Sequence, residues 1–159
     1  MKIQILCVGK IKEKFYRDAI LEFEKRLSRY CKLEIVEVND EQTPEDASEA
    51  IKEQIKAKEG VRILSKIGRD AFVVTLEILG RKMDSVEFSK FMEHAAVIGK
   101  GQLIFIIGGS LGLSKEVCER SDQAISFSDM TFPHQLMRVI LCEQIYRGFR
   151  IQNNEPYHK

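Results

Sequence analysis

Residues 103–112 read Leu103-Ile104-Phe105-Ile106-Ile107-Gly108-Gly109-Ser110-Leu111-Gly112, an unbroken apolar run followed by a glycine-rich turn. The apolar run has no polar position, which is typical of a strand covered on both faces of a sheet. Ser114 follows the turn and predicts the start of a short helix, because its hydroxyl can accept hydrogen bonds from free backbone N–H groups. A buried strand, a tight turn and a helix in succession indicate an α/β domain.

The rest of the chain alternates between strand and helix patterns on both sides of this unit. Further strands are predicted at residues 3–8, 33–38, 71–76 and 124–127, with Gly80 turning the chain after the third of the five strands. Longer helices are predicted at residues 15–30, from a cap at Thr43 towards Gly68, from Asp84 to Gly99, and from Pro133 to Gln152. This alternation implies a mostly parallel sheet with helices on both faces. No repeat or linker interrupts it, so we expect one domain over residues 1–159.

Three of the predicted strands end in segments suited to binding a ligand. Ligands of parallel sheets bind outside the carboxyl ends of the strands, which here are residues 76–77, 108–112 and 127–132. Gly108 and Gly109 let the backbone approach a ligand closely, because they lack a Cβ. The turn lacks the Gly-x-Gly-x-x-Gly spacing and follows the fourth strand rather than the first, so it does not by itself indicate a dinucleotide site. A simple tight connection explains it equally well.

The composition is that of a globular protein, with 44% hydrophobic and 31% charged residues. No apolar run approaches the roughly 18 residues of a membrane span, and the amino-terminal residues lack the apolar core of a signal peptide. The four cysteines show no Cys-x-x-Cys spacing, which argues against a zinc site and favours free thiols in a reducing compartment. The sequence therefore predicts a cytoplasmic protein without a metal and without a membrane partner.

A net charge of +1 conceals a segregation of charge along the chain. Residues 10–32 hold eight basic and four acidic side chains, whereas residues 34–59 hold nine acidic and three basic ones. Ordinary solvated helix faces would give this pattern. A basic surface for a polyanion, with the acidic stretch turned away from it, would give it equally well.

The last predicted helix is apolar on most of its circumference. Its hydrophobic positions are Leu136, Met137, Val139, Ile140, Leu141, Cys142, Ile145, Tyr146 and Phe149. A helix of this kind is buried on most sides, which is difficult for the terminal helix of a small monomer. The pattern favours a homodimer that covers the extra face over a helix at the centre of a single core.

Polar groups on the same helix raise the question of catalysis. His134 and Arg138 lie one turn apart, and Arg138 needs a partner because burying an unpaired guanidinium is costly. Both a carboxylate partner and a functional role remain open for it. His134 and Cys142 are separated by about 12 Å along a helix, which excludes a Cys–His nucleophile pair. The chain ends in Tyr157-His158-Lys159, groups that can stack on a base, handle a proton and contact a phosphate.

Four segments in order carry a family resemblance that extends over essentially all of the chain. They are residues 105–110 (FIIGGS), 126–134 (SFSDMTFPH), 143–147 (EQIYR) and 156–159 (PYHK). On these segments the chain resembles the ribosomal large-subunit methyltransferase H family, the pseudouridine-N3 methyltransferases of the SPOUT superfamily. Several long motifs in the right order argue against coincidence.

The resemblance implies a SPOUT-type α/β fold with a trefoil knot at its carboxyl end, a homodimer, and S-adenosylmethionine held in the knot as methyl donor. The matching cofactor positions are Leu76, Gly108, Phe127, Ser128, Asp129, Met130, Thr131 and Phe132. They fall on the three strand ends that the sheet pattern indicates. The Asp129 carboxylate can face solvent, so its backbone is the part expected to contribute.

The implied reaction is methylation of N3 of a pseudouridine in the stem-loop of large-subunit rRNA that faces the small subunit. We expect His134 to bind or deprotonate the target base, with Tyr157 and His158 as positioning or proton-handling groups. Arg138, Arg147 and Lys159 are expected to hold phosphates or carbonyl oxygens of the RNA. We also expect each tail to complete the active site of the partner subunit.

Two alternative functions are compatible with parts of the sequence. A nicotinamide-dependent oxidoreductase could use the glycine turn, although the loop spacing argues against it. A non-catalytic ribosome-binding assembly factor would bind ribosomes without transferring a methyl group. Neither accounts for the whole set of motifs.

Overall fold

The computed structural model describes all 159 residues and contains five strands and five helices. The strands are β1 (Lys2–Val8), β2 (Lys32–Val38), β3 (Phe72–Lys82), β4 (Gln102–Ile107) and β5 (Gln123–Ser126). The helices are α1 (Lys14–Leu27), α2 (Glu49–Leu64), α3 (Ser85–Ile98), α4 (Lys115–Arg120) and α5 (His134–Gln152). No helix is long and apolar enough to cross a membrane.

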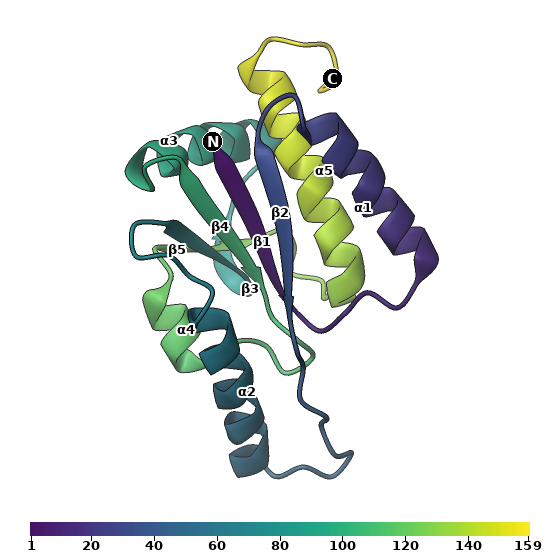
Figure 1. Cartoon of the computed structure of the whole chain (residues 1–159), viewed down its shortest axis with the longest axis vertical. Coiled ribbons are helices and arrows are strands. Elements are labelled where there is room, and N and C mark those ends of the chain that lie inside the picture. Colours follow the sequence, from purple (N-terminus) through teal and green to yellow (C-terminus); the bar gives the residue numbers. More distant parts are fainter.

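The strands form one sheet in the order β2-β1-β4-β3-β5, and every pairing is parallel. Helices α1, α3 and α5 pack on one face of this sheet and helices α2 and α4 on the other (Figure 1). The predicted α/β fold, with a parallel sheet covered on both faces, is confirmed. The trefoil knot stays a prediction.

Alternating side chains of the central strands build a separate core on each face. In β1, Ile3 and Ile5 join the core beneath α1, α3 and α5, whereas Leu6 and Val8 join the core beneath α2 and α4. β4 divides its side chains in the same way. Since successive residues of a strand point to opposite faces, an unbroken apolar run is what a strand between two cores requires.

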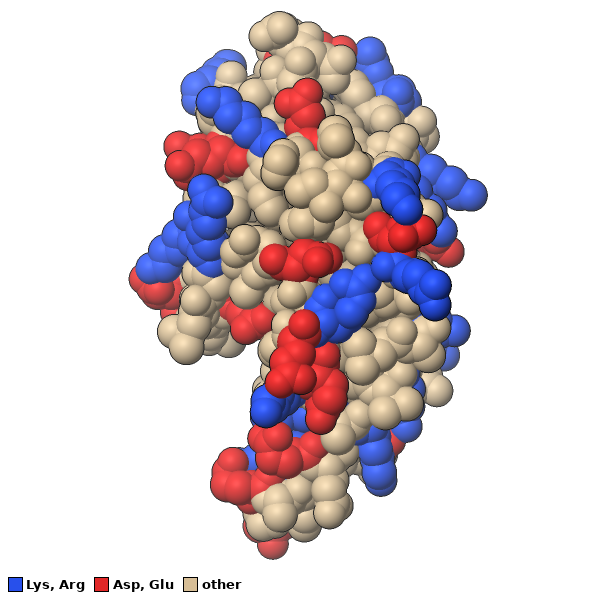
Figure 2. Space-filling view, turned by 90° about the vertical axis from the view of Figure 1, so that its left-hand side faces the viewer, with Lys and Arg blue, Asp and Glu red and all other residues tan.

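Charge is distributed unevenly over the two faces. The basic segment of the sequence includes α1, and the acidic segment leads into α2 on the opposite face of the sheet. Acidic side chains gather at the lower end of the view in Figure 2, the end formed by α2. The structure therefore separates the two charged segments in space as well as in sequence.

Most predicted element boundaries agree with the structure, and one clear error concerns α2. The predicted start at Thr43 is wrong: residues 44–47 close a single turn, in which the Ala47 N–H donates to the Pro44 carbonyl at 3.2 Å. The helix begins at Glu49, where the Ser48 hydroxyl accepts a hydrogen bond from the Ile51 N–H at 3.3 Å. Two capping signals lie close together here, and the second is the one used.

A second error concerns the end of β3. The sequence predicts a strand that stops at Leu76 and a turn at Gly80, but β3 continues to Lys82. Leu76 and Arg81 both pair with Ile125 of β5, so residues 77–80 bulge out between them. A Cβ at Gly80 would lie 2.5 Å from the Ile125 carbonyl carbon, so this glycine permits close strand packing rather than a turn.

Candidate active site

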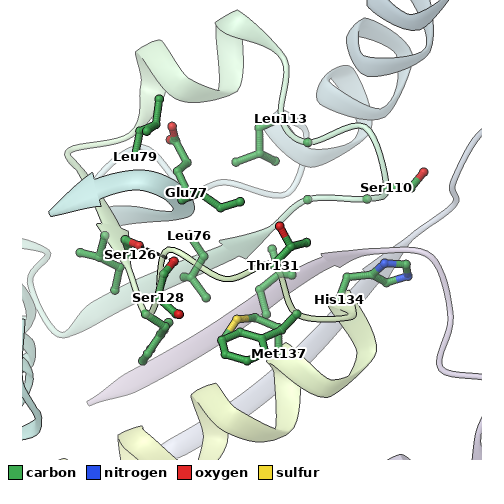
Figure 3. A pocket seen from close by; sticks show the side chains of 18 of the residues that line it. Leu76, Glu77, Leu79, Ser110, Leu113, Ser126, Ser128, Thr131, His134 and Met137 are labelled. Atoms are coloured by element: carbon green, nitrogen blue, oxygen red, sulfur yellow. Dashed lines mark hydrogen bonds between the residues drawn. The ribbon is translucent and has the colours of Figure 1, made fainter. Parts of the chain in front are cut away.

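A cavity of about 520 Å³ opens beside the bulge of β3 and the carboxyl ends of β4 and β5. Twenty-one residues line it, and twelve of them are hydrophobic. Figure 3 shows side chains from the bulge within β3, the turn after β4, the loop after β5 and the start of α5 surrounding this space. Its size and largely apolar wall are typical of small-molecule sites.

Seven of the eight residues predicted to hold a cofactor line this single cavity. They are Leu76, Gly108, Phe127, Ser128, Met130, Thr131 and Phe132. The eighth, Asp129, is not part of the wall; its side chain is 78% exposed and forms an ion pair with Lys82. The loop after β5 thus lines the cavity with most of its residues and turns its one carboxylate, Asp129, to the solvent.

Internal hydrogen bonds shape the loop after β5. The Ser126 hydroxyl donates to the Ser128 carbonyl at 3.1 Å, and the Ser128 hydroxyl accepts from the Met130 N–H at 2.9 Å. Both serine side chains are therefore engaged with the loop backbone, which fixes the wall of the cavity without a regular element. Pro133 then ends the loop and precedes the first residue of α5.

His134 stands at this first position of α5 and lines the cavity. Burial, together with the nearby positive charge of Arg138, lowers the pKa of His134 below its ordinary value of 6.5. Its imidazole is therefore neutral at pH 7 and can accept a proton. Gln135, the next residue, accepts a hydrogen bond from the Lys12 N–H, which ties the start of α5 to the loop before α1.

Arg138 does not occupy the position that the sequence predicts. Its side chain is fully buried and forms an ion pair with Glu37 at 2.7 Å. It also donates to the carbonyls of Val8 and Gly9 at 3.0 and 2.8 Å. A guanidinium without exposed surface cannot hold an RNA phosphate in this arrangement, so we correct its predicted role to one of joining α5 to the ends of β1 and β2.

Replacing Arg138 by Ala should therefore cost stability rather than RNA affinity alone. The change leaves a cavity, an unpaired Glu37 and two buried carbonyls without their donor, which together are expected to cost about 3–5 kcal/mol of unfolding free energy. Urea unfolding measures this quantity. Arg69→Ala, at an exposed arginine, is the matched control and should change the unfolding free energy by no more than about 0.5 kcal/mol. An Arg138→Ala protein as stable as the control would contradict the structural role.

The predicted tail residues follow the carboxyl end of α5, the end opposite to His134 (Figure 1). The Tyr157 hydroxyl donates to Glu143 at 3.2 Å, and its ring meets the Tyr146 ring edge-on at 4.9 Å. Arg147 binds Glu143, covers the Tyr157 ring at 4.7 Å and approaches His158 Nδ1 at 3.4 Å. Three of the predicted groups, Tyr157, Arg147 and His158, therefore gather beside Glu143 in the middle of α5, about 14 Å along the helix axis from His134 at its first position.

Several cavity residues have no counterpart among the predicted site residues. The turn and the short helix α4 contribute Leu113 and Cys118, and the helix α5 contributes Met137. Glu77 also lines the cavity; the sequence indicates the strand end at residues 76–77 but assigns no role to this side chain. Met137 lies three residues after His134, so helical spacing was a usable signal for it. The position of Cys118 depends on how α4 packs against the end of β3, and no local pattern indicates it.

Comparison with known protein families adds an independent observation. The family described as "Predicted SPOUT methyltransferase" matches residues 1–158. The chain belongs to the SPOUT methyltransferase family. It is 57% identical to ribosomal RNA large subunit methyltransferase H of Clostridium botulinum and 55% identical to ribosomal RNA large subunit methyltransferase H 1 of Clostridium perfringens, and both alignments cover the whole of each chain.

A solved structure supports the fold of this SPOUT methyltransferase. The structure of a probable methylase family protein from Haemophilus influenzae superposes with a TM-score of 0.51 over 96% of the present chain and 66% of that protein. The two sequences are 13% identical, so this likeness concerns the fold alone.

The cavity fits the methyl donor that the SPOUT family implies. S-adenosylmethionine combines an adenine, a ribose and a charged methionine portion, and it needs apolar walls with a few polar groups. The cavity offers both, since Leu76, Phe127 and Phe132 are accompanied by the hydroxyls of Ser110 and Thr131. The backbone at Gly108 packs closely against the end of the same turn: a Cβ there would lie 3.0 Å from the Gly112 carbonyl carbon and 3.1 Å from Leu113 Cδ2.

Gly108→Val should consequently weaken binding of S-adenosylmethionine by at least about tenfold. The added branched side chain forces Gly112 or Leu113 to move, and both belong to the wall of the cavity. Isothermal titration calorimetry of the folded variant provides the measurement. The control is Ala96→Gly, on α3 away from the cavity, which should bind S-adenosylmethionine normally. Gly101→Ala would not serve as a control, because Gly101 has a φ of 81°, a backbone conformation that alanine adopts only with strain. Unchanged affinity in Gly108→Val would remove this turn from the binding site.

Proposed function

We propose that this protein transfers a methyl group from S-adenosylmethionine to N3 of a pseudouridine in the intersubunit stem-loop of large-subunit rRNA. The observation that carries the proposal is the single cavity beside the bulge of β3 and the ends of β4 and β5, lined by seven residues selected from the sequence. Its wall contains His134, a neutral imidazole at the mouth of the site. The full-length relatives that bear the name of rRNA large subunit methyltransferases support the choice of substrate class.

The chain's own contribution to such a reaction is mainly positioning. When bound, S-adenosylmethionine supplies a methyl group on a positively charged sulfur, and it leaves as a neutral thioether. The imide N3 of the base becomes nucleophilic when it loses its proton, so no covalent enzyme intermediate is required. The buried thiols fit this view, since burial raises the pKa of Cys7 to about 12 and that of Cys142 still further. Orienting the reactants can contribute up to about 7–11 kcal/mol in favourable cases.

In this proposal His134 accepts the N3 proton or hydrogen-bonds the base. It lines the cavity, and its lowered pKa keeps a lone pair free at neutral pH. Arg138 lies one turn further along α5 and supports the neutral form of the imidazole electrostatically. The ion pair between Arg138 and Glu37 also holds this end of the helix against β1 and β2, which fixes the position of His134.

A homodimer would bring the tail to the cavity. The apolar residues Leu136, Val139 and Ile140 remain partly exposed on α5, as expected of a face that a second subunit covers. Two α5 helices packed antiparallel about a twofold axis would place the carboxyl end of one beside the amino end of the other. The Tyr157, His158 and Lys159 of one subunit would then lie near the partner's copy of the His134 cavity.

We call the cavity of one subunit together with the tail of the other the composite site. RNA recognition would use the positive charge near it. Arg147 contacts Tyr157 and His158, and Lys159 is the last residue of the tail. The basic segment before and within α1 is joined to the start of α5 by the hydrogen bond from the Lys12 N–H to Gln135. We expect much of the specificity to come from the shape of the ribosome. A ribosomal substrate would place its action in the cytoplasm.

The test is to incubate the protein with labelled S-adenosylmethionine and ribosomes that lack the modification. We expect label in large-subunit rRNA, and mass spectrometry of nuclease fragments should place it on N3 of one pseudouridine. Ribosomes already modified at this position are the control and should accept no label. Normal binding to ribosomes without any transfer would instead favour the alternative, a non-catalytic assembly factor.

A further inference from the structure

The cavity contains one formally charged side chain. Among its lining residues only Glu77 is charged at neutral pH, because burial and Arg138 keep His134 in the neutral form. Cys118 also lines the cavity, but burial and the neighbouring Glu77 carboxylate raise the pKa of its thiol, so it stays protonated. Asp129, the carboxylate of the loop after β5, is not part of the cavity wall and pairs with Lys82. The charge of the cavity is therefore negative and is located at Glu77.

The local structure holds this carboxylate in a defined place. Thr75, which is fully buried, donates its hydroxyl to Glu77 Oε1 at 2.6 Å. Thr75 in turn lies 3.3 Å from the Ser121 hydroxyl, so the chain of contacts reaches the end of α4. Glu77 is the first residue of the bulge between the two paired parts of β3, and bulges commonly redirect a side chain next to a functional site. No basic side chain forms an ion pair with Glu77.

The methyl donor and its product differ by one positive charge at sulfur. Transfer of the methyl group converts a sulfonium into a thioether, while the rest of the molecule is unchanged. An apolar wall and neutral hydroxyls bind the two forms with similar strength, whereas a fixed carboxylate beside a largely apolar wall favours the cation. We propose, on the basis of the proposed function, that Glu77 selects the charged methyl donor over its neutral product.

The decisive experiment compares three ligands by isothermal titration calorimetry: S-adenosylmethionine, S-adenosylhomocysteine and sinefungin, in which an ammonium replaces the sulfonium methyl group. Glu77→Gln keeps the shape of the side chain and an acceptor for Thr75, but it removes the charge. The preference for S-adenosylmethionine over S-adenosylhomocysteine should fall about tenfold, which corresponds to about 1.4 kcal/mol, and sinefungin should lose affinity in parallel. Affinity for S-adenosylhomocysteine should stay within about twofold of the wild-type value.

Two controls separate charge from structure. Glu119→Gln removes an exposed carboxylate of α4, paired with Lys115 at 3.5 Å, and should leave the ligand preference unchanged. Glu77→Asp and Glu77→Asn form a second pair of equal size, in which the preference should persist with Asp and disappear with Asn. This pair decides the question if Glu77→Gln fails to fold.

The outcomes also distinguish this inference from the proposed function. A wild-type protein that binds none of the three ligands overturns both. A wild-type protein that binds S-adenosylmethionine, with the same preference in folded Glu77→Gln or Glu77→Asn, overturns the role of Glu77 and leaves the proposed function standing.

Discussion

Removal of residues 157–159 should abolish methyl transfer while leaving the fold and the affinity for S-adenosylmethionine intact. The tail follows the carboxyl end of α5, the end opposite to His134, so its loss changes none of the residues that line the binding site. Truncation after Pro156 retains Glu155, which pairs with Arg150 at 2.7 Å and accepts a hydrogen bond from Tyr30. The end of the helix should therefore keep its packing. Single-turnover transfer to unmodified ribosomes measures the loss.

The truncated protein needs two accompanying measurements. Sedimentation should show an unchanged oligomeric state, and calorimetry should show an unchanged dissociation constant for S-adenosylmethionine. Methyl transfer at the wild-type rate would show that Tyr157, His158 and Lys159 have no part in the reaction. Loss of cofactor affinity along with activity would place the tail in the cavity rather than at the RNA.

His134→Ala should reduce the rate of methyl transfer by roughly 10²–10⁴-fold, the usual contribution of a positioned acid or base. The cavity loses its only imidazole, while Ala is well tolerated at the start of a helix, so folding and binding of S-adenosylmethionine should persist. Single-turnover rates at saturating cofactor provide the comparison. His94→Ala, at an exposed histidine of α3, is the matched control and should transfer normally.

The pH dependence gives this prediction a second readout. The lowered pKa of His134 means that its neutral form persists below pH 6.5, so the wild-type rate should decline with acid only below that value. The variant should lack this inflection. A variant with near-normal rates and the wild-type pH profile would leave His134 as a helix-start residue without a catalytic role.

The periodicity of apolar residues was sufficient to predict the sheet and its two covered faces. In β4 the five side chains from Leu103 to Ile107 belong alternately to the two cores, and the sequence shows this as an uninterrupted run of Leu, Ile and Phe. Local capping signals also sufficed for α3, where Asp84 and Glu87 form a reciprocal capping box and Gly99 ends the helix. These features depend on residues close together in the sequence.

Features that depend on distant residues were not predictable in the same way. The length of β3 is set by pairing with Ile125, a residue of another strand, and the bulge at residues 77–80 follows from that pairing. The sequence left both a carboxylate partner and an RNA contact open for Arg138, because its partner Glu37 lies 101 residues away in sequence. A long-range contact of this kind leaves no local pattern, so the identity of the partner emerged only from the folded chain.

The candidate site contains features of both kinds, some predictable from local sequence and some dependent on distant residues. The ends of parallel strands could be located from the sequence, and seven predicted residues do line one cavity there. The separation between this cavity and the cluster around Tyr157 could not be predicted, because it depends on the course of α5 across the sheet. That separation makes the composite site the central claim of the present account.

Mixed dimers test this claim most directly. One subunit lacks residues 157–159 but has an intact cavity, and the other carries Gly108→Val but has an intact tail; each homodimer alone should be inactive. If the site is shared, equal co-expression should restore about one quarter of wild-type transfer, since about half of the dimers are mixed and each holds one complete site. Mass spectrometry confirms that mixed dimers have formed. Their complete inactivity would contradict an active site built from the cavity of one subunit and the tail of the other.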